Sequence, residues 1–321
     1  EDMIMKAPSP DIMNKLARSV LALYSYDENP DDTSLENVLR QCISIIAQIP
    51  VIMVYAYQVK RRHYYKKSMY IHPIKPEHTA AQAVLGSIRA DKTFTDEEAK
   101  LLDTCLMVHA EHGGGNNSTF ATRVLTSSGT DTYSAIAAGI GALKGPKHGG
   151  ANIKVAQMVD FIRNDVADIN DEGQVADYLR KIIQKEGGDR SGLIYGMGHA
   201  VYTISDPRAK ILREQAGKFA AGTEFEEEFH LLNSIEKLTP AIFAEFKGER
   251  KNICANVDLY SVLVYKMLRI PPDLFTPIFT VARVAGWSAH RIEELLTGGR
   301  IIRPAYKNIN TAGLYVPITE R

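Results

Sequence analysis

The sequence predicts an all-α protein. Apolar residues recur at helical spacing along most of the 321-residue chain, and several of these segments open with recognisable N-terminal caps. Strand patterns are nearly absent, because only Tyr70-Ile71 and Leu314-Tyr315-Val316 suggest short extended pieces. No alternation of strands and helices appears, which excludes a Rossmann-type sheet.

Two capping boxes are predicted in the first hundred residues. Thr95 is expected as an N-cap, with the Glu98 side chain reaching back to its backbone. Thr33 and Glu36 repeat this spacing before a long apolar helix. We expect Pro50 to kink or end that helix, since proline lacks the backbone N–H that an interior position requires.

A later helix is expected to start at Asp206, with Pro207 at its first position, where the missing N–H costs nothing. Its apolar pattern ends near Ala220. Further helices are predicted over residues 131–144, 151–165, 173–185, 223–246, 255–268 and 276–296.

Composition limits the classes of partner. Lysine plus arginine equals aspartate plus glutamate at 38 each, so no net positive charge favours nucleic acid or an anionic membrane. The three cysteines, Cys42, Cys105 and Cys254, show no CxxC spacing, which argues against a disulfide framework or a zinc finger. Residues 1–6 lack the pattern of a signal peptide, and no segment is apolar for long enough to span a bilayer. We therefore expect a soluble, cytoplasmic protein.

Glycine-rich segments carry most of the candidate chemistry. His109 and His112, in HAEHGGGN, could share a helix face; alternatively, one is a core histidine and the other lies at the helix end. Zinc is a weaker interpretation of this pair, because the HExxH order is absent and no third ligand is indicated.

The segment GPKHGGAN places His148 in a tight loop between two predicted helices. A helix that begins near Ala151 would direct its positive end towards His148 and disfavour imidazolium. A neutral histidine there could donate a hydrogen bond to a developing enolate. The alternative is a solvent-facing loop histidine.

Two further segments combine acid–base groups with arginines. His199, in GMGHAV, precedes Arg208 by a short loop, which suits a carboxylate and carbonyl site, although a surface ion pair is the ordinary alternative for the arginine. Asp258, in NVD, stands at the head of an apolar helix, where a cap is the default role. Arg283 lies inside a predicted helix, and Arg303 precedes Pro304 near the C-terminus.

Taken in order, HAEHGGGN, GPKHGGAN, GMGHAV with DPR, NVD, VAR and RP resemble the signatures of the citrate synthase family over most of residues 95–305. The resemblance implies an all-α fold with a large and a small helical domain and an active site in the cleft between them. The first part of the large domain would cover residues 1–150, the small domain 151–268, and the chain would return to the large domain over 269–321.

The resemblance also implies catalytic roles for three residues. Asp258 would remove a methyl proton from acetyl-CoA, His148 would stabilise the enol or enolate, and His199 would polarise the ketone of oxaloacetate. Such a division is physically reasonable, because a thioester α-proton is too weakly acidic for a carboxylate acting alone. The product would be citrate, and no metal or organic cofactor is implied.

Oxaloacetate would be bound by His112, Arg208 and Arg283, with Arg303 contributed across the interface of a homodimer. The loop from Leu193 to Gly198 resembles the segment of the family that faces CoA; its implied contacts are Leu193, Tyr195, Gly196, Met197 and Gly198.

Some features depart from the family pattern. More chain normally precedes the first histidine signature, so the sequence is expected to be shortened at its N-terminus. The alternatives are a 2-methylcitrate synthase that uses propionyl-CoA and a non-catalytic relative retained for assembly or regulation. One methylene in an apolar pocket discriminates by only about 1–3 kcal/mol, and no single residue identifies the thioester.

Overall fold

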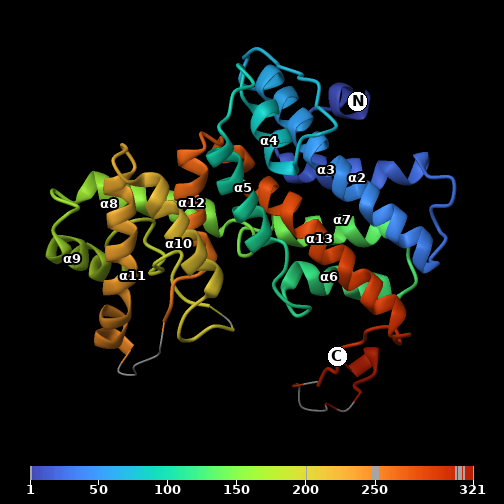
Figure 1. Ribbon diagram of the computed structural model, residues 1–321. Coiled ribbons are helices and arrows are strands. Elements are labelled where there is room, and N and C mark those ends of the chain that lie inside the picture. The colour runs from blue at the N-terminus through green and yellow to red at the C-terminus, as the bar shows by residue number, and fades with distance from the viewer. Residues whose placement is uncertain are drawn as a thin grey trace.

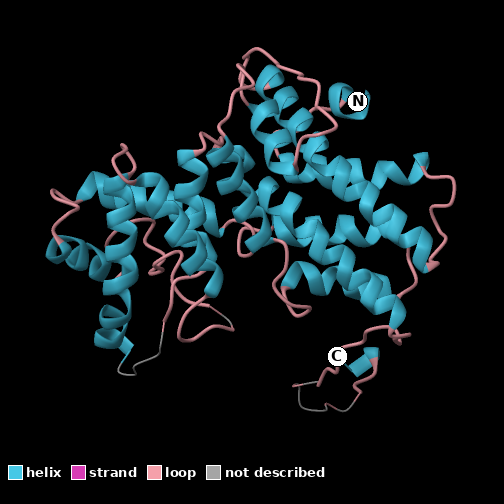
Figure 2. Cartoon of the chain, viewed as in Figure 1, coloured by secondary structure: helices cyan, strands magenta, loops and turns pink. Residues whose placement is uncertain are grey.

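The computed structural model describes residues 2–199, 201–247, 253–307, 309, 313 and 315–320. Within these residues all regular structure is helical, as Figure 2 shows, and the β-type pairing is an isolated bridge between Met197 and Ala255. Tyr70-Ile71 and Tyr315-Val316 form no strand, and Leu314 lies outside the described residues. The prediction of an all-α fold is confirmed.

The long helices match the predicted ranges closely, with boundaries that differ by a few residues. The α-helices are α1 (Asp2–Lys6), α2 (Ile12–Leu23), α3 (Leu35–His63), α4 (Ala80–Ile88), α5 (Asp96–His109), α6 (Asn117–Ser127), α7 (Thr132–Lys144), α8 (Ala151–Asp165), α9 (Glu172–Ile183), α10 (Pro207–Ala220), α11 (Glu226–Lys247), α12 (Val257–Met267) and α13 (Phe275–Leu296). Short 3₁₀ turns are η1 (Tyr24–Tyr26), η2 (Pro272–Leu274) and η3 (Ile318–Glu320).

The helices form two groups that meet at α5 and α12. Figure 1 shows α8 to α12 on one side and α1 to α7 with α13 on the other. Within the first group α8 and α10 pack on α12, and α9 packs on α11. Helix α5 contacts α4 and α13 in one group and α10 and α12 in the other. The division at residues 150 and 268 stays a prediction.

Most of the predicted helix starts are correct. Thr95 forms the expected capping box, and Asp206 caps α10 by accepting the N–H of Arg208. The capping box predicted at Thr33 was wrong, because Ser34 is the N-cap of α3 and makes no capping hydrogen bond. Its hydroxyl instead donates to Asp32 Oδ2 at 2.9 Å.

Helix α3 is long and continuous. It passes through Pro50 and runs on to His63, so it does not end at this proline, and the predicted kink stays a prediction. An 18-residue window of α3 has a mean hydropathy of 1.7, and the helix is long and apolar enough to cross a membrane. The prediction that no segment of the chain has this length and composition was therefore wrong. However, 56% of that window is buried inside the protein. A helix in the core of a globular protein can have the same length and hydropathy, so these two properties do not distinguish it from a membrane span.

Helix α13 occupies the centre of its group. All residues from Phe275 to Ser288 except Ala285 are buried, and the helix packs against α3, α5, α6 and α7. Burying so much apolar surface is the main source of stability in such a helix, at about 25 cal/mol per Å². Its buried Arg291 donates to Thr132 Oγ1, Thr126 Oγ1 and the Thr130 carbonyl at 2.9–3.2 Å.

Arg89 connects three helices where the two groups meet. Its guanidinium makes a bidentate pair with Glu98, with both distances 2.7 Å. It also donates to the carbonyls of Thr93 and Leu268, each at 2.8 Å. Both side chains are almost fully buried, so this pair fastens the end of α4 and the start of α5 to the C-terminal end of α12.

We expect Arg89→Met to lower the free energy of unfolding by about 3 kcal/mol, because it leaves the buried Glu98 carboxylate without its charged partner. Urea denaturation followed by circular dichroism measures the change. Arg62→Met is a matched control, since Arg62 is exposed at the end of α3. Equal stability of the two variants would show that the buried pair does not hold these helices together.

Candidate active site

Asp258 lies in the first turn of α12, and Asn256 fixes its position. The Asn256 side chain accepts the Asp258 N–H at 3.0 Å and donates to the Gly198 carbonyl at 3.0 Å. Gly198 N–H donates in turn to the Cys254 carbonyl at 2.8 Å. The cap is therefore Asn256, not Asp258, and the start of α12 is attached to the loop that carries His199.

The environment of Asp258 makes its carboxylate a stronger base than that of an ordinary aspartate. The residue is half-buried, and none of the hydrogen bonds in the described part of the chain ends on its carboxylate. Burial raises the pKa of Asp258 to about 6, although the positive charges of Arg208 and Arg283 oppose this shift. Such a carboxylate is ionised near neutral pH and more basic than an ordinary aspartate.

His199 has a defined hydrogen-bond pattern. Its Nδ1 atom lies 2.9 Å from the backbone N–H groups of both Val201 and Tyr202, so the neutral ring should carry its proton on Nε2. Burial lowers the pKa of His199; the nearby Asp206 opposes this effect, and Arg208 adds to it. The imidazole is thereby held as a neutral donor.

Two donors face each other beside this ring. His199 Nε2 lies 3.3 Å from Arg208 Nη2. Arg208 is fixed by Asp206, which accepts from its Nε at 3.0 Å and from its Nη2 at 2.7 Å. An oxygen acceptor that lies within hydrogen-bonding distance of both Nε2 and Nη2 would satisfy both groups.

His112 lies directly across from His199. It follows the end of α5, and the centroids of the two rings are 4.8 Å apart, close to perpendicular. The Tyr202 ring lies 4.7 Å from His199 and 6.0 Å from His112. Burial, with the charge of Arg208 as the next cause, lowers the pKa of His112 to about 4, so this ring is neutral at pH 7.

His109 and His112 do not share a helix face. His109 is a buried core histidine whose Nδ1 lies 2.6 Å from the Cys105 carbonyl, whereas His112 lies beyond the helix end. The ordinary interpretation of this pair was therefore correct for His109. Among the described residues, no group of three or more histidine, cysteine, aspartate or glutamate side chains could hold a metal ion.

Arg283 is fully buried on α13. Its Nε donates to the His109 carbonyl at 2.6 Å, its Nη1 donates to Asn116 Oδ1 at 3.2 Å, and its charge lies over the Phe279 ring at 4.7 Å. Its Nη2 has no hydrogen-bond partner in the described part of the chain. Burial lowers the pKa of Arg283 to about 10, so the guanidinium remains charged.

His148 lies in the turn before α8, as predicted. Its Nε2 is 2.9 Å from Ser118 Oγ, which also accepts a hydrogen bond from Trp287 Nε1 at 3.2 Å. Nδ1 is therefore the nitrogen left for another partner. Burial and the charge of Arg283 lower the pKa of His148 to about 4, which keeps it neutral.

Gly149 allows this turn to pack. A Cβ atom at Gly149 would overlap the Leu143 carbonyl and approach Thr276 Cγ2 to 2.7 Å. The Gly149 carbonyl also accepts from Thr276 Oγ1 at 2.7 Å. The turn that presents His148 is thus fixed against α7 and α13.

The loop predicted to face CoA lies beside Asp258. The Gly196 carbonyl accepts the Asn256 N–H at 2.9 Å, and Met197 makes the isolated bridge with Ala255. Gly196 and Gly198 have φ of +81° and +94°, which suits glycine. Leu193 is exposed, and the Tyr195 hydroxyl donates to Asp189 at 2.7 Å.

Arg303, predicted to bind oxaloacetate across a dimer interface, makes no recorded contact with the other predicted site residues within the described part of this chain. It is exposed in the C-terminal segment, which projects from the end of α13 in Figure 1. The segment is anchored upstream, where Ile302 N–H donates to Ser127 Oγ at 3.0 Å.

Sequence reasoning missed several residues that shape the site. Asn116, Ser118 and Trp287 connect Arg283 and His148, and Tyr202 completes the ring cluster. Asp206 was predicted as a cap, but not as the carboxylate that orients Arg208. Asn116 and Asp206 lie inside the quoted motifs, whereas nothing in the local sequence marks Trp287 or Tyr202.

Comparison with known proteins identifies the family of this chain. The family model described as "Citrate synthase, C-terminal domain" matches residues 1–305. A citrate synthase of Synechocystis is 42% identical over 224 residues, which cover 70% of this chain and about half (52%) of that protein. A 2-methylcitrate synthase of Corynebacterium glutamicum is 32% identical over 317 residues, which cover 96% of this chain and 75% of its own length.

Solved structures show the same fold. The citrate synthase of Thermoplasma acidophilum, in a ternary complex with carboxymethyl coenzyme A and oxaloacetate, matches 100% of this chain and 79% of its own, with a TM-score of 0.79 and 28% identity. The citrate synthase of Pyrobaculum aerophilum matches with a TM-score of 0.76 and 28% identity, over 100% of this chain and 76% of its own. The chain belongs to the citrate synthase family.

Proposed function

We propose that this chain carries the active site of a citrate synthase, which condenses acetyl-CoA with oxaloacetate and water to give citrate and CoA. The observation that carries the proposal is the pair of facing donors, His199 Nε2 and Arg208 Nη2, at 3.3 Å. A 2-oxo dicarboxylate supplies both a carbonyl and a carboxylate oxygen to such donors.

The proposed oxaloacetate site is positively charged and contains neutral histidines. Arg208 and Arg283 would bind the two carboxylates, and the free Nη2 of Arg283 supports this role. His112 faces His199 and would make a further contact. Charge-assisted bonds of this kind bind a dianion to a chain of zero net charge.

Asp258 and His148 would act together on the thioester. Asp258 removes a proton from the methyl carbon, and the electrons of that C–H bond move to the carbonyl oxygen. His148 stabilises this oxygen through Nδ1, since its Nε2 already contacts Ser118. The Ser118 hydroxyl donates to Asn116 Oδ1 at 3.1 Å, and this role requires it to donate its proton to His148 Nε2 instead, so that Nδ1 carries a hydrogen.

His199 would then assist carbon–carbon bond formation. The enolate carbon attacks the ketone carbon of oxaloacetate, and Nε2–H donates to the ketone oxygen as negative charge develops there. Water cleaves the resulting thioester to release citrate and CoA. All of these steps use side chains and water, and none requires a metal or an organic cofactor.

Acyl-CoA would approach along the loop from Leu193 to Gly198. This loop is hydrogen-bonded to the start of α12, so a thioester bound against it would reach Asp258. The Corynebacterium relative that covers 96% of this chain is a 2-methylcitrate synthase. Propionyl-CoA is therefore the second candidate substrate.

A homodimer is part of the proposal. The outer face of α3 carries an apolar stripe of Leu35, Leu39, Ile43 and Ile46, which are 47%, 47%, 58% and 37% exposed. Such a stripe on a helix favours burial against a second surface. In the dimer Arg303 would reach the partner's oxaloacetate site.

The proposal is tested by the release of free CoA thiol from acetyl-CoA or propionyl-CoA in the presence of oxaloacetate. We expect Asp258→Asn to lower kcat by about 10³-fold, because the base is lost, while oxaloacetate affinity changes less than about threefold. Asp103→Asn, an exposed change on α5, is the control. The faster thioester identifies the substrate.

Failure of the wild-type protein to release thiol while it still binds oxaloacetate would contradict the catalytic proposal and favour a non-catalytic relative. Loss of oxaloacetate binding in Asp258→Asn would contradict the assigned role of this residue, because the arginines are unchanged.

The pH dependence of kcat/KM should report Asp258. The base is active only when ionised, so activity should be constant above the pKa of about 6 and fall about tenfold per pH unit below it. An ordinary aspartate, with a pKa of 3.8, would keep full activity to about pH 4.5. Steady-state rates from pH 4.5 to 8.5 distinguish the two cases.

Arg303→Ala should weaken oxaloacetate binding about tenfold, since it removes one charge-assisted contact. Calorimetry measures the affinity, and sedimentation checks that the dimer persists. Arg300→Ala is the matched control, because Arg300 is also exposed in this segment. Unchanged affinity in an intact dimer would argue against a shared site.

A further inference from the structure

Glu111 makes an unusual set of contacts between α5 and α6. Its Oε1 atom accepts the backbone N–H of His112 at 2.8 Å and also the backbone N–H of Gly113. The same oxygen lies 3.1 Å from His290 Nε2 on α13. One carboxylate oxygen thus joins the backbone of the His112 loop to the central helix.

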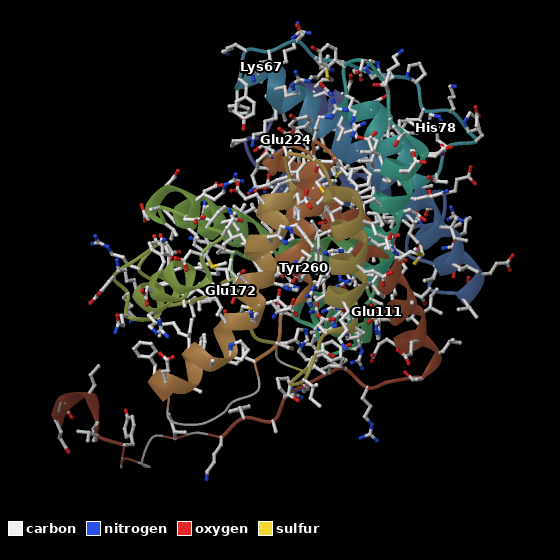
Figure 3. All side chains as sticks on the ribbon, turned by 60° about the vertical axis from the view of Figure 1, so that its left-hand side comes forward. Lys67, His78, Glu111, Glu172, Glu224 and Tyr260 are labelled. Carbon is white, nitrogen blue, oxygen red and sulfur yellow. The ribbon has the colours of Figure 1, made fainter. Side chains whose placement is uncertain are left out.

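These contacts determine where the His112 ring lies. Gly113 has a φ of +82°, so the chain turns sharply directly after His112. Two N–H groups fixed on one oxygen leave the backbone at His112 little freedom, and its ring then faces His199 at 4.8 Å. Figure 3 labels Glu111 among the side chains.

Helix α13 approaches this loop closely enough to act as its support. A Cβ atom at Gly286 would overlap the Ala110 carbonyl and the Glu111 carboxylate. A Cβ atom at Gly114 would lie 3.3 Å from His290 Cε1 and 3.1 Å from Arg123 Nη1. The other ring nitrogen of His290, Nδ1, lies 3.1 Å from Glu293 Oε2, so carboxylates lie at both nitrogens of the ring.

The ordinary interpretation of Glu111 is an exposed loop carboxylate of no consequence, since 46% of its side-chain surface is accessible. Against that, the backbone N–H groups of His112 and Gly113 and the His290 ring all converge on one oxygen of this side chain. The two backbone donors flank the residue that faces His199. A free surface carboxylate would not be fastened to a second helix.

We propose that Glu111, held by His290, is a positioning residue that orients His112 for oxaloacetate binding. The inference rests on the proposed function, in which His112 contacts oxaloacetate. It predicts that Glu111 acts through the geometry of the backbone and not through its charge. An acceptor of the same shape without the charge should therefore suffice.

The experiment compares Glu111→Ala, Glu111→Gln and the control Asp103→Ala. Asp103 is an exposed acidic residue on α5. Two quantities are measured in the protein without substrate and with oxaloacetate: hydrogen exchange of the His112 and Gly113 amides by NMR, and oxaloacetate affinity by calorimetry. KM and kcat are measured in parallel.

We expect Glu111→Ala to speed exchange of both amides and to weaken oxaloacetate binding about tenfold, with the loss in KM and not in kcat. Glu111→Gln should restore both properties to within about threefold, because its amide oxygen still accepts the two N–H groups. Asp103→Ala should resemble the wild type in both.

Unchanged amide exchange or unchanged oxaloacetate affinity in a folded Glu111→Ala would overturn the inference, as would a Glu111→Gln as impaired as the alanine variant. If Glu111→Ala does not fold, His290→Ala provides the test, since it leaves Glu111 in place but removes its support. It should then show the same two changes at smaller size, and wild-type behaviour would count against the inference.

Failure of the proposed function can be distinguished from failure of this inference. If wild-type protein binds no oxaloacetate, the proposed function is wrong, whatever the amides show. If wild-type protein binds oxaloacetate and Glu111→Ala binds it equally well, the function stands and the positioning role does not.

Discussion

A guanidinium can be buried only where other groups replace the water it loses, and Arg283 imposes this constraint on the centre of the molecule. No carboxylate contacts it among the described residues; the His109 carbonyl, the Asn116 amide and the face of Phe279 surround it. Two of these groups, the His109 carbonyl and the Asn116 amide, stand at the two ends of the segment that joins α5 to α6. That segment must therefore close against α13, whose apolar residues hold the helix in the core.

The same burial has opposite effects on acids and bases. It lowers the pKa values of His112 and His148 to about 4 and raises that of Asp258 to about 6. Removing water disfavours whichever form carries charge, so the histidines stay neutral donors and the carboxylate becomes a better base. The proposed division of roles thus follows from one physical cause, and the two arginines moderate it.

Much of the fold could be predicted from the sequence, because the signals that start and stop a helix lie within a few residues of its ends. The capping box at Thr95 and the proline after Asp206 each predicted a helix start that the structure confirms. The same rule failed at Thr33, where the hydroxyl of Ser34 turns back to Asp32. A capping pattern cannot show which acceptor a side chain will choose.

The site was harder to predict in detail. The motifs single out His148, His199 and Asp258, but they do not identify the groups that hold these side chains in place. Trp287 contacts Ser118 across 169 positions of the chain. No local pattern encodes such a pairing, since it arises only when α13 packs against α6. The ordinary interpretation of Asp258 as a cap was wrong because Asn256 takes that position.

The amide of Asn256 uses its two ends in opposite directions, donating to Gly198 and accepting from Asp258. An aspartate would match its shape but could not donate, and a leucine could do neither. In a redesign of this region, position 256 therefore tolerates no isosteric replacement. A redesign that moves this site into another protein would have to move the loop of His199 and the first turn of α12 together, with asparagine kept at position 256 to connect them.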